Sequence, residues 1–143
     1  YAGRFTDSEC CAVSKYAEEK ELKIFCIGGI QACCDKFIDC NPFQVIAYFR
    51  DAECVVTDTF HGTILSVITH KCFGVFVRDK GYGNSEKLAD LLKRLGLESR
   101  RISKTEGMKN VLEQEFDYGK TDQIIDEGRR LAKEYLREQI IFE

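Results

Sequence analysis

The residues best suited to chemistry lie together in residues 54–63, which read Cys-Val-Val-Thr-Asp-Thr-Phe-His-Gly-Thr. A short apolar run ends in hydroxyl and carboxylate side chains, and a helical pattern follows. His61, one of only two histidines in the chain, lies at this turn. A strand that turns into a helix leaves backbone N–H groups free at the helix start, and these groups suit an anion. The segment therefore predicts an anion site with an imidazole beside it.

His61 is the predicted general acid of this site, because histidine is the side chain that exchanges a proton most readily near neutral pH. The positive end of the following helix disfavours the imidazolium form, whereas a bound anion favours it. We therefore predict that His61 is protonated mainly when an anionic substrate binds. Asp58 is predicted to orient His61 or to take a proton from a substrate hydroxyl. The structural alternatives are that His61 packs at the helix start and that Asp58 caps the helix.

Hydroxyl and glycine residues around His61 are the predicted anion ligands. Thr57, Thr59 and Thr63 can donate hydrogen bonds to an anion, and a capping role for these threonines is compatible with that function. Gly62 allows backbone N–H groups to approach an anion closely.

Four further candidates lie in other loops that are expected beside this site. Arg4 follows Gly3 in the first predicted strand-to-helix loop, and Arg78 lies in the fourth. Each arginine offers the planar fork of donors that a carboxylate or phosphate prefers, and the alternative for each is a solvated side chain. Asn84 and Ser85 begin a predicted helix, where they could bind phosphate or cap the helix.

Apolar runs alternate with helical patterns along the chain. Strands are predicted at residues 22–27, 54–57, 72–77 and 100–102, and helices at residues 7–20, 42–50 and 62–70. The helix that Asn84 and Ser85 begin ends before Gly96 and carries on one face Leu88, Leu91, Leu92 and Leu95. Asp7 or Ser8 is the expected cap of the first helix, and Asn41 caps the second. A long last helix is predicted to begin at Thr121 or Asp122. Its predicted core residues are Ile124, Ile125, Leu131, Tyr135 and Leu136.

Strands that alternate with helices build a parallel sheet with helices on both of its faces. This pattern predicts an α/β fold with a sheet of about four to five strands. In such a fold, ligands bind where the carboxyl ends of the strands lead into helices. The loops at residues 3–4, 28–31, 57–63 and 78–85 are therefore expected at one edge of the sheet.

The composition is that of one globular domain. Hydrophobic content of 44% and charged content of 31% in 143 residues are ordinary values. A net charge of −3 without a basic block argues against a nucleic-acid partner, and no apolar run approaches the roughly 18 residues of a membrane span. The chain begins with Tyr1 rather than Met and has no export signal, so we expect a fragment of a longer polypeptide.

Eight cysteines are unusually many for a chain of this length. A disulfide scaffold is typical of small secreted domains, and zinc sites use Cys-x-x-Cys pairs, which this sequence lacks. Cys33, Cys34 and Cys40 could meet His61 only by an accident of folding, so we predict no metal and no cofactor. The favoured interpretation is reduced, cytoplasmic thiols that act as small hydrophobic side chains. The thiols expected in or beside strands are Cys26, Cys54 and Cys72.

Residues 52–63 are the centre of a longer pattern. An Asn-Pro-Phe helix start at Asn41 precedes them, and Ser66 and an apolar strand at residues 73–77 follow. Asn84 then lies in a loop that leads into a Leu-Leu-x-x-Leu-x-Leu helix at residues 91–97. From residue 40 to residue 101, this pattern resembles the polysaccharide pyruvyl transferase family.

The resemblance implies a two-domain enzyme similar to the GT-B glycosyltransferases, with a cleft between two Rossmann-like halves. Residues 1–143 would form the single carboxyl-terminal, donor-binding domain, and an amino-terminal domain would be missing. The family moves pyruvate from phosphoenolpyruvate onto two hydroxyls of a sugar, in a polysaccharide or its precursor, and forms a cyclic ketal. The expected location is the cytoplasm, at the inner face of the membrane.

One departure from the family pattern concerns the donor. Many members have Arg-Leu-His where this chain has Thr59-Phe60-His61. The arginine that would hold the anionic groups of the donor is absent there, so another basic residue replaces it or the donor differs. Two other functions stay open at this point. The domain could belong to a glycosyltransferase that uses a nucleotide sugar, or it could be a non-catalytic domain that binds a partner.

Overall fold

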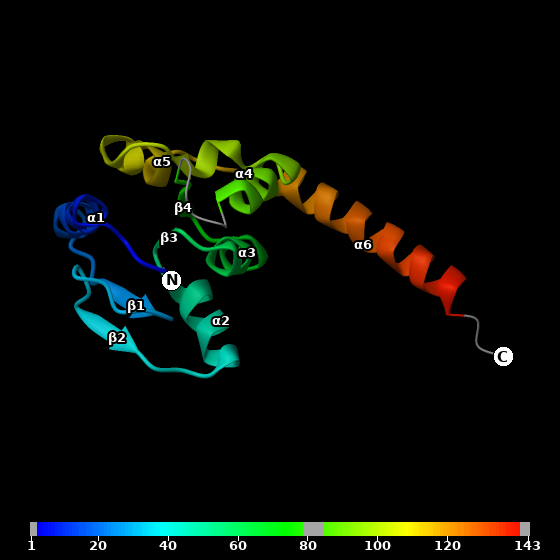
Figure 1. The fold of residues 1–143 in the computed structure, drawn as a ribbon, viewed down its shortest axis with the longest axis horizontal. Coiled ribbons are helices and arrows are strands. Elements are labelled where there is room, and N and C mark those ends of the chain that lie inside the picture. Colours follow the sequence, from blue (N-terminus) through cyan, green and yellow to red (C-terminus); the bar gives the residue numbers. More distant parts are fainter. Residues whose placement is uncertain (1–2, 79–84, 141–143) are drawn as a thin grey trace.

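Short parallel strands alternate with helices in this computed structural model, which describes residues 3–78 and 85–140 (Figure 1). The strands are β1 (Phe25–Ile27), β2 (Lys36–Ile38), β3 (Val55–Thr57), β4 (Phe73–Phe76) and β5 (Arg101–Ile102). The helices are α1 (Asp7–Glu19), α2 (Pro42–Asp51), α3 (Phe60–Ile68), α4 (Ser85–Arg94), α5 (Met108–Glu113) and α6 (Gly119–Gln139). The predicted α/β class is confirmed.

The strands form two parallel sheets in the described part of the chain, and the predicted single sheet of four to five strands is not found there. One sheet pairs β1 with β2, and the other has the order β3-β4-β5. The two sheets are divided by a cavity of about 610 Å³ that both β1 and β3 line. Tyr16 of α1 and Tyr48 of α2 line the same cavity.

β2 is the strand that the sequence patterns missed. It stands between Asp35 and Asp39, and of its three residues only Ile38 is buried. The segment therefore has no apolar run. The backbone ladder to β1 defines it instead, and hydrophobic periodicity does not report backbone pairing.

The core lies on the two faces of the β3-β4-β5 sheet. Phe73 and Val75 of β4 are fully buried and belong to the same cluster as Leu88 of α4. Phe76 points to the opposite face, as alternation along a strand requires, and belongs to a second cluster with Met108 of α5. Helices therefore cover both faces of this sheet, as predicted.

Polar side chains cap the first two helices. Thr6 caps α1, rather than the predicted Asp7 or Ser8. Its hydroxyl accepts a hydrogen bond from the Glu9 N–H, while the Glu9 carboxylate accepts one from the Thr6 N–H. Asn41 caps α2, as predicted. The reciprocal hydrogen bonds between Thr6 and Glu9 therefore mark the start of α1.

Contacts with the rest of the domain hold the start of α6. Thr121 and Asp122, the predicted caps, both lie inside the helix, which begins at Gly119. The buried Thr121 hydroxyl donates a hydrogen bond to the Leu95 carbonyl at 3.1 Å. Oδ1 of Asp122 lies 2.9 Å from Nε2 of His70. The two side chains therefore join α6 to neighbouring elements rather than cap it.

The second half of α6 is exposed where the sequence predicts core. Leu131, Tyr135 and Leu136 are 52%, 62% and 52% exposed, because α6 extends away from both sheets (Figure 1). Arg129 and Arg130 pair with acidic side chains three or four positions away, as on a solvated helix. In residues 3–78 and 85–140, no helix combines the length and the apolar character that crossing a membrane requires.

Candidate functional site

The start of α3 carries two backbone N–H groups without a hydrogen-bond acceptor in the described part of the chain. Thr59 is the N-cap, and its hydroxyl accepts a hydrogen bond from the Gly62 N–H at 3.0 Å. The Thr63 N–H binds the Thr59 carbonyl at 3.1 Å. The N–H groups of Phe60 and His61 lie before these bonds and remain open. Together with the helix dipole, they form a place where an anion can bind.

His61 is the second residue of α3 and is exposed. Its ring stands edge-on to the ring of Phe60, with centroids 6.2 Å apart. Among residues 3–78 and 85–140, its imidazole has no hydrogen-bond or ion-pair partner. The structure therefore leaves the imidazole open to a substrate beside the two N–H groups.

The threonine hydroxyls around His61 serve the turn. Thr57 is fully buried, and its Oγ1 accepts a hydrogen bond from the Thr59 N–H at 3.1 Å. Thr63 is fully buried as well, and its hydroxyl donates to the Thr59 carbonyl at 2.9 Å. The capping role is confirmed for Thr59. The anion-binding role of the three hydroxyls stays a prediction.

Gly62 is required by close packing. A Cβ atom on Gly62 would lie 2.2 Å from Oγ1 of Thr57 and 2.9 Å from Oγ1 of Thr59, closer than real Cβ atoms come to other atoms. The buried Ser66 hydroxyl, one turn later, donates to the Gly62 carbonyl at 2.8 Å. The glycine therefore lets α3 start directly against the end of β3.

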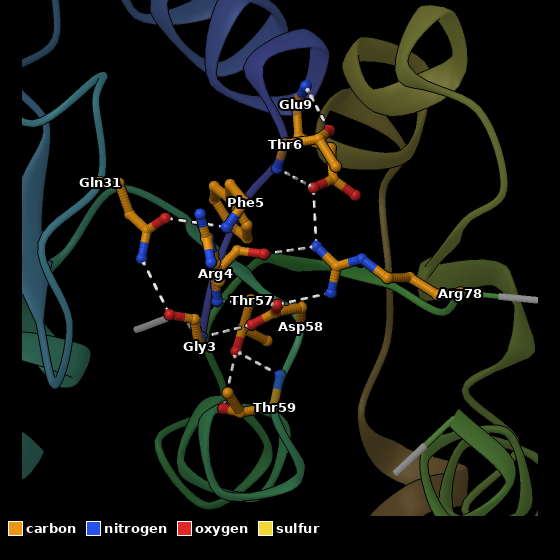
Figure 2. A network of polar contacts seen from close by, with 10 residues as sticks. All are labelled: Gly3, Arg4, Phe5, Thr6, Glu9, Gln31, Thr57, Asp58, Thr59 and Arg78. Atoms are coloured by element: carbon orange, nitrogen blue, oxygen red, sulfur yellow. Dashed lines mark hydrogen bonds and ion pairs between the residues drawn. The ribbon is translucent and has the colours of Figure 1, made fainter. Parts of the chain in front are cut away.

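Asp58 lies at the centre of a buried polar network (Figure 2). Its side chain is 5% exposed. Its Oδ1 accepts a hydrogen bond from the Gly3 N–H at 2.6 Å, and its Oδ2 accepts from Nη1 of Arg78 at 2.6 Å and from the Arg4 N–H at 3.3 Å. Burial opposes ionisation of this carboxyl, but the three hydrogen bonds outweigh burial and lower the pKa of Asp58.

Arg78 joins Asp58 to α1. Its Nη2 donates to Oε2 of Glu9 at 2.7 Å and to the Arg4 carbonyl at 2.8 Å. Burial disfavours the charged guanidinium, but the hydrogen bonds that Arg78 donates to Asp58 and Glu9 outweigh burial and raise the pKa of Arg78. Two carboxylates thus share one guanidinium, so a donor anion at Arg78 would have to displace one of them.

Gln31 and Glu9 belong to this network although the sequence analysis did not select them. Gln31 is 6% exposed, accepts a hydrogen bond from the Phe5 N–H at 2.8 Å and donates one to the Gly3 carbonyl at 3.3 Å. The Thr6-x-x-Glu9 spacing is a capping-box signal that could have found Glu9. Gln31 carried no such signal, because its partners are backbone groups far away in the sequence.

The remaining predicted site residues are Arg4, Asn84 and Ser85. Arg4 is exposed, and within the described residues its side chain has no hydrogen-bond or ion-pair partner. Asn84 lies outside the described residues, and Ser85 is the first residue of α4. His61 and Asp58 lie at the same turn, yet the described contacts of Asp58 do not include His61. The predicted catalytic role of Asp58 stays a prediction.

The eight cysteines are free thiols. Burial raises the pKa of Cys26 and of Cys54 to about 11 and that of Cys33 to about 12, which makes these thiols poor nucleophiles. Cys26 lies in β1 and Cys54 directly before β3, as predicted. Within the part of the chain that the structure describes, no three His, Cys, Asp or Glu side chains gather as they would around a metal ion.

Comparison with known proteins adds one match. Residues 12–80 match the family model described as polysaccharide pyruvyl transferase. This segment includes β1 to β4, the start of α3 with His61, and Arg78. The comparisons with curated proteins and with solved structures found no match. This match confirms the predicted resemblance to the polysaccharide pyruvyl transferase family over residues 12–80.

Proposed function

We propose that this chain is the donor-binding domain of an enzyme that moves a pyruvyl group from phosphoenolpyruvate onto sugar hydroxyls of a polysaccharide or its precursor. The observation that carries the proposal is the start of α3. There, an exposed imidazole without a partner among the described residues stands beside two open N–H groups, inside the segment that matches the family. A substrate that is both an anion and a proton acceptor fits this pair of features.

The proposed chemistry uses His61 as a proton donor. Phosphoenolpyruvate binds with an anionic group at the N–H groups of Phe60 and His61, and His61 gives its proton to the methylene carbon. The neighbouring enol carbon becomes electrophilic, and the first sugar hydroxyl adds to it. Phosphate leaves with the electron pair of its C–O bond, and the second hydroxyl adds at the same carbon. The two hydroxyl protons go to His61 and to the phosphate, so the products are the ketal and inorganic phosphate.

The proposal includes a larger enzyme around this domain. The two sheets would belong to one Rossmann-like layer, and a second, amino-terminal domain would complete a GT-B-like cleft that holds the acceptor. The parallel pairing within each of the two sheets supports this arrangement, as does the position of β1 and β3 on one cavity. The eight free thiols support a cytoplasmic location.

A donor screen by calorimetry on the full-length protein tests the proposal. We expect phosphoenolpyruvate to bind and nucleotide sugars not to bind. The variant His61→Ala should retain the donor and lose the release of inorganic phosphate in the presence of acceptor. His70→Ala is the matched control, because His70 lies at the other end of α3, where it stacks on Tyr118 and pairs with Asp122.

Three results would contradict the proposal. Binding of a nucleotide sugar alone would favour a glycosyltransferase. Full activity of His61→Ala would remove His61 from the mechanism. An intact protein that binds neither donor would favour a domain that recognises a partner without catalysis.

A further inference from the structure

Three side chains from the carboxyl ends of three strands bind one short backbone segment, residues 3–5 (Figure 2). Gln31 follows β1, Asp58 follows β3 and Arg78 follows β4. Asp58 binds the N–H groups of Gly3 and Arg4, Arg78 binds the Arg4 carbonyl, and Gln31 binds the Gly3 carbonyl and the Phe5 N–H. Every backbone polar group from the Gly3 N–H to the Phe5 N–H therefore has a side-chain partner.

This arrangement differs from that of an ordinary connecting segment. Loops on a protein surface commonly leave part of their backbone to water. Here Asp58 and Gln31 are themselves buried, and Arg78 is 16% exposed, so the segment is held by side chains that cannot easily move. Glu9 extends the hold by one residue, since its Oε2 accepts both the Thr6 N–H at 2.7 Å and Nη2 of Arg78 at 2.7 Å.

The held segment lies against the start of α3. A methyl group placed on Gly3 would come within 3.7 Å of Cγ2 of Thr59, the residue that caps α3. Arg4 is the next residue, and its exposed side chain has no hydrogen-bond or ion-pair partner among the described residues. The long side chain of Arg4 therefore begins one residue away from this contact with the cap of α3.

The charges around the segment make Arg4 the better cation for that anion. The guanidinium of Arg78 is shared by the carboxylates of Asp58 and Glu9, whereas Arg4 is tied only through its backbone. A planar guanidinium without a competing carboxylate can form two parallel hydrogen bonds to a carboxylate or phosphate.

We propose that Asp58, Arg78 and Gln31 are positioning residues that hold Arg4 beside the start of α3, and that Arg4 makes the contact with the anionic donor. The identity of this donor as phosphoenolpyruvate rests on the proposed function. The positioning of residues 3–5 by Asp58, Arg78 and Gln31 does not rest on the proposed function, because it follows from the hydrogen bonds alone.

Two measurements on the full-length protein test the two parts of the proposal. Amide hydrogen exchange in a peptide that covers residues 3–6 reports the hold on the segment, and calorimetry with phosphoenolpyruvate reports the donor contact. Arg4→Ala should weaken donor binding roughly tenfold or more without faster exchange, since it removes only a charged hydrogen-bond donor. Asp58→Asn should weaken binding to a similar degree and speed exchange as well.

Further variants separate positioning from a general loss of structure. Gln31→Ala removes two bonds to the segment and no charge, so it should speed exchange and weaken binding less than Asp58→Asn does. Arg78→Lys should restore part of the affinity that Arg78→Ala loses. Gly128→Ala is the matched control, because it lies in α6 with no atom within 4 Å of an added methyl group, and both measurements should stay as in the wild type. With saturating acceptor, Arg4→Ala should raise the KM for the donor more than it lowers kcat.

The outcomes are distinguishable. Unchanged exchange in Asp58→Asn, or wild-type donor affinity in Arg4→Ala, would overturn the inference while the proposed function stands. A wild-type protein that does not bind phosphoenolpyruvate would overturn the proposed function and the donor contact, and the exchange of residues 3–6 would still decide the positioning role.

Discussion

The start of α3 and the network around Asp58 adjoin each other, yet their polar side chains differ in exposure and in hydrogen bonding. His61 is exposed, and in the described part of the chain its imidazole has no hydrogen-bond partner, whereas Asp58 is buried and accepts three hydrogen bonds. Three positions separate the two residues in the sequence. Their residue types made both of them candidates for catalysis. Their hydrogen-bond partners show the difference, because His61 is available to a substrate whereas Asp58 is already bound to other groups of the protein.

This difference has an energetic consequence. A polar group that water already solvates can be removed at little cost to folding, whereas a buried charge that loses its partner leaves the remaining groups unsatisfied. Substitutions at the start of α3 should therefore change activity more than stability, and substitutions in the Asp58 network should change both.

The largest expected difference in stability is between Asp58→Ala and His61→Ala. Asp58→Ala removes the acceptor for Arg78, Gly3 and Arg4, and we expect it to lower the free energy of unfolding by about 3 kcal/mol. His61→Ala should change it by less than about 0.5 kcal/mol, because the side chain is exposed. Urea unfolding of both variants measures the difference. Equal losses would show that the two regions do not differ as described.

The next effect is expected at Gly62, where the start of α3 packs on the end of β3. Gly62→Ala would force a methyl group to 2.2 Å from Oγ1 of Thr57, and we expect a loss of about 1–3 kcal/mol in the free energy of unfolding. Gly128→Ala is the matched control, because it lies inside α6 with no atom within 4 Å of an added Cβ. This change should stabilise the protein by up to about 1 kcal/mol through helix propensity. A harmless Gly62→Ala would contradict the close packing of α3 on β3.

A smaller effect should appear in the pH dependence of stability. The pKa of Asp58 is lowered in the folded protein, so its contribution is fully present above the unfolded value of about 4 and is lost as the pH falls through the lower, folded value. Asp58→Asn cannot ionise and lacks this contribution at every pH. The difference in unfolding free energy between wild type and Asp58→Asn should therefore become smaller as the pH falls below about 4. A difference that stays constant would argue against an ionised Asp58 in the network.

Local signals predicted the helices of this molecule other than α5, and they predicted its buried strands. Asn41 in front of Pro42 marked the start of α2, and the apolar run at residues 72–77 marked β4, because each signal lies within a few consecutive residues. β2 and the division into two sheets were not predictable in this way, since they depend on pairing between distant strands. The exposed half of α6 was missed because an apolar stripe does not reveal whether a core lies opposite it.

In the candidate site, too, local sequence patterns predicted the local features and missed the contacts between distant residues. The turn that presents His61 was found from residues 54–63 alone, because strand, cap and helix follow one another there. The partners of Arg78, in contrast, lie 20, 69 and 74 positions away in the sequence. Its guanidinium looked equally suited to a donor anion and to solvent, and only the fold brings Asp58 and Glu9 to it.

The smallest effect we expect concerns the cap itself. Thr59→Ala removes the oxygen that accepts the Gly62 N–H, and loss of an N-cap should lower the free energy of unfolding by about 1 kcal/mol. Thr59→Ser keeps that oxygen and should stay near the wild type in urea unfolding. If the open N–H groups of Phe60 and His61 bind the donor, fraying of this turn should also weaken phosphoenolpyruvate binding in Thr59→Ala and not in Thr59→Ser. Equal donor affinity in the two variants would argue that the anion does not rest on the start of α3.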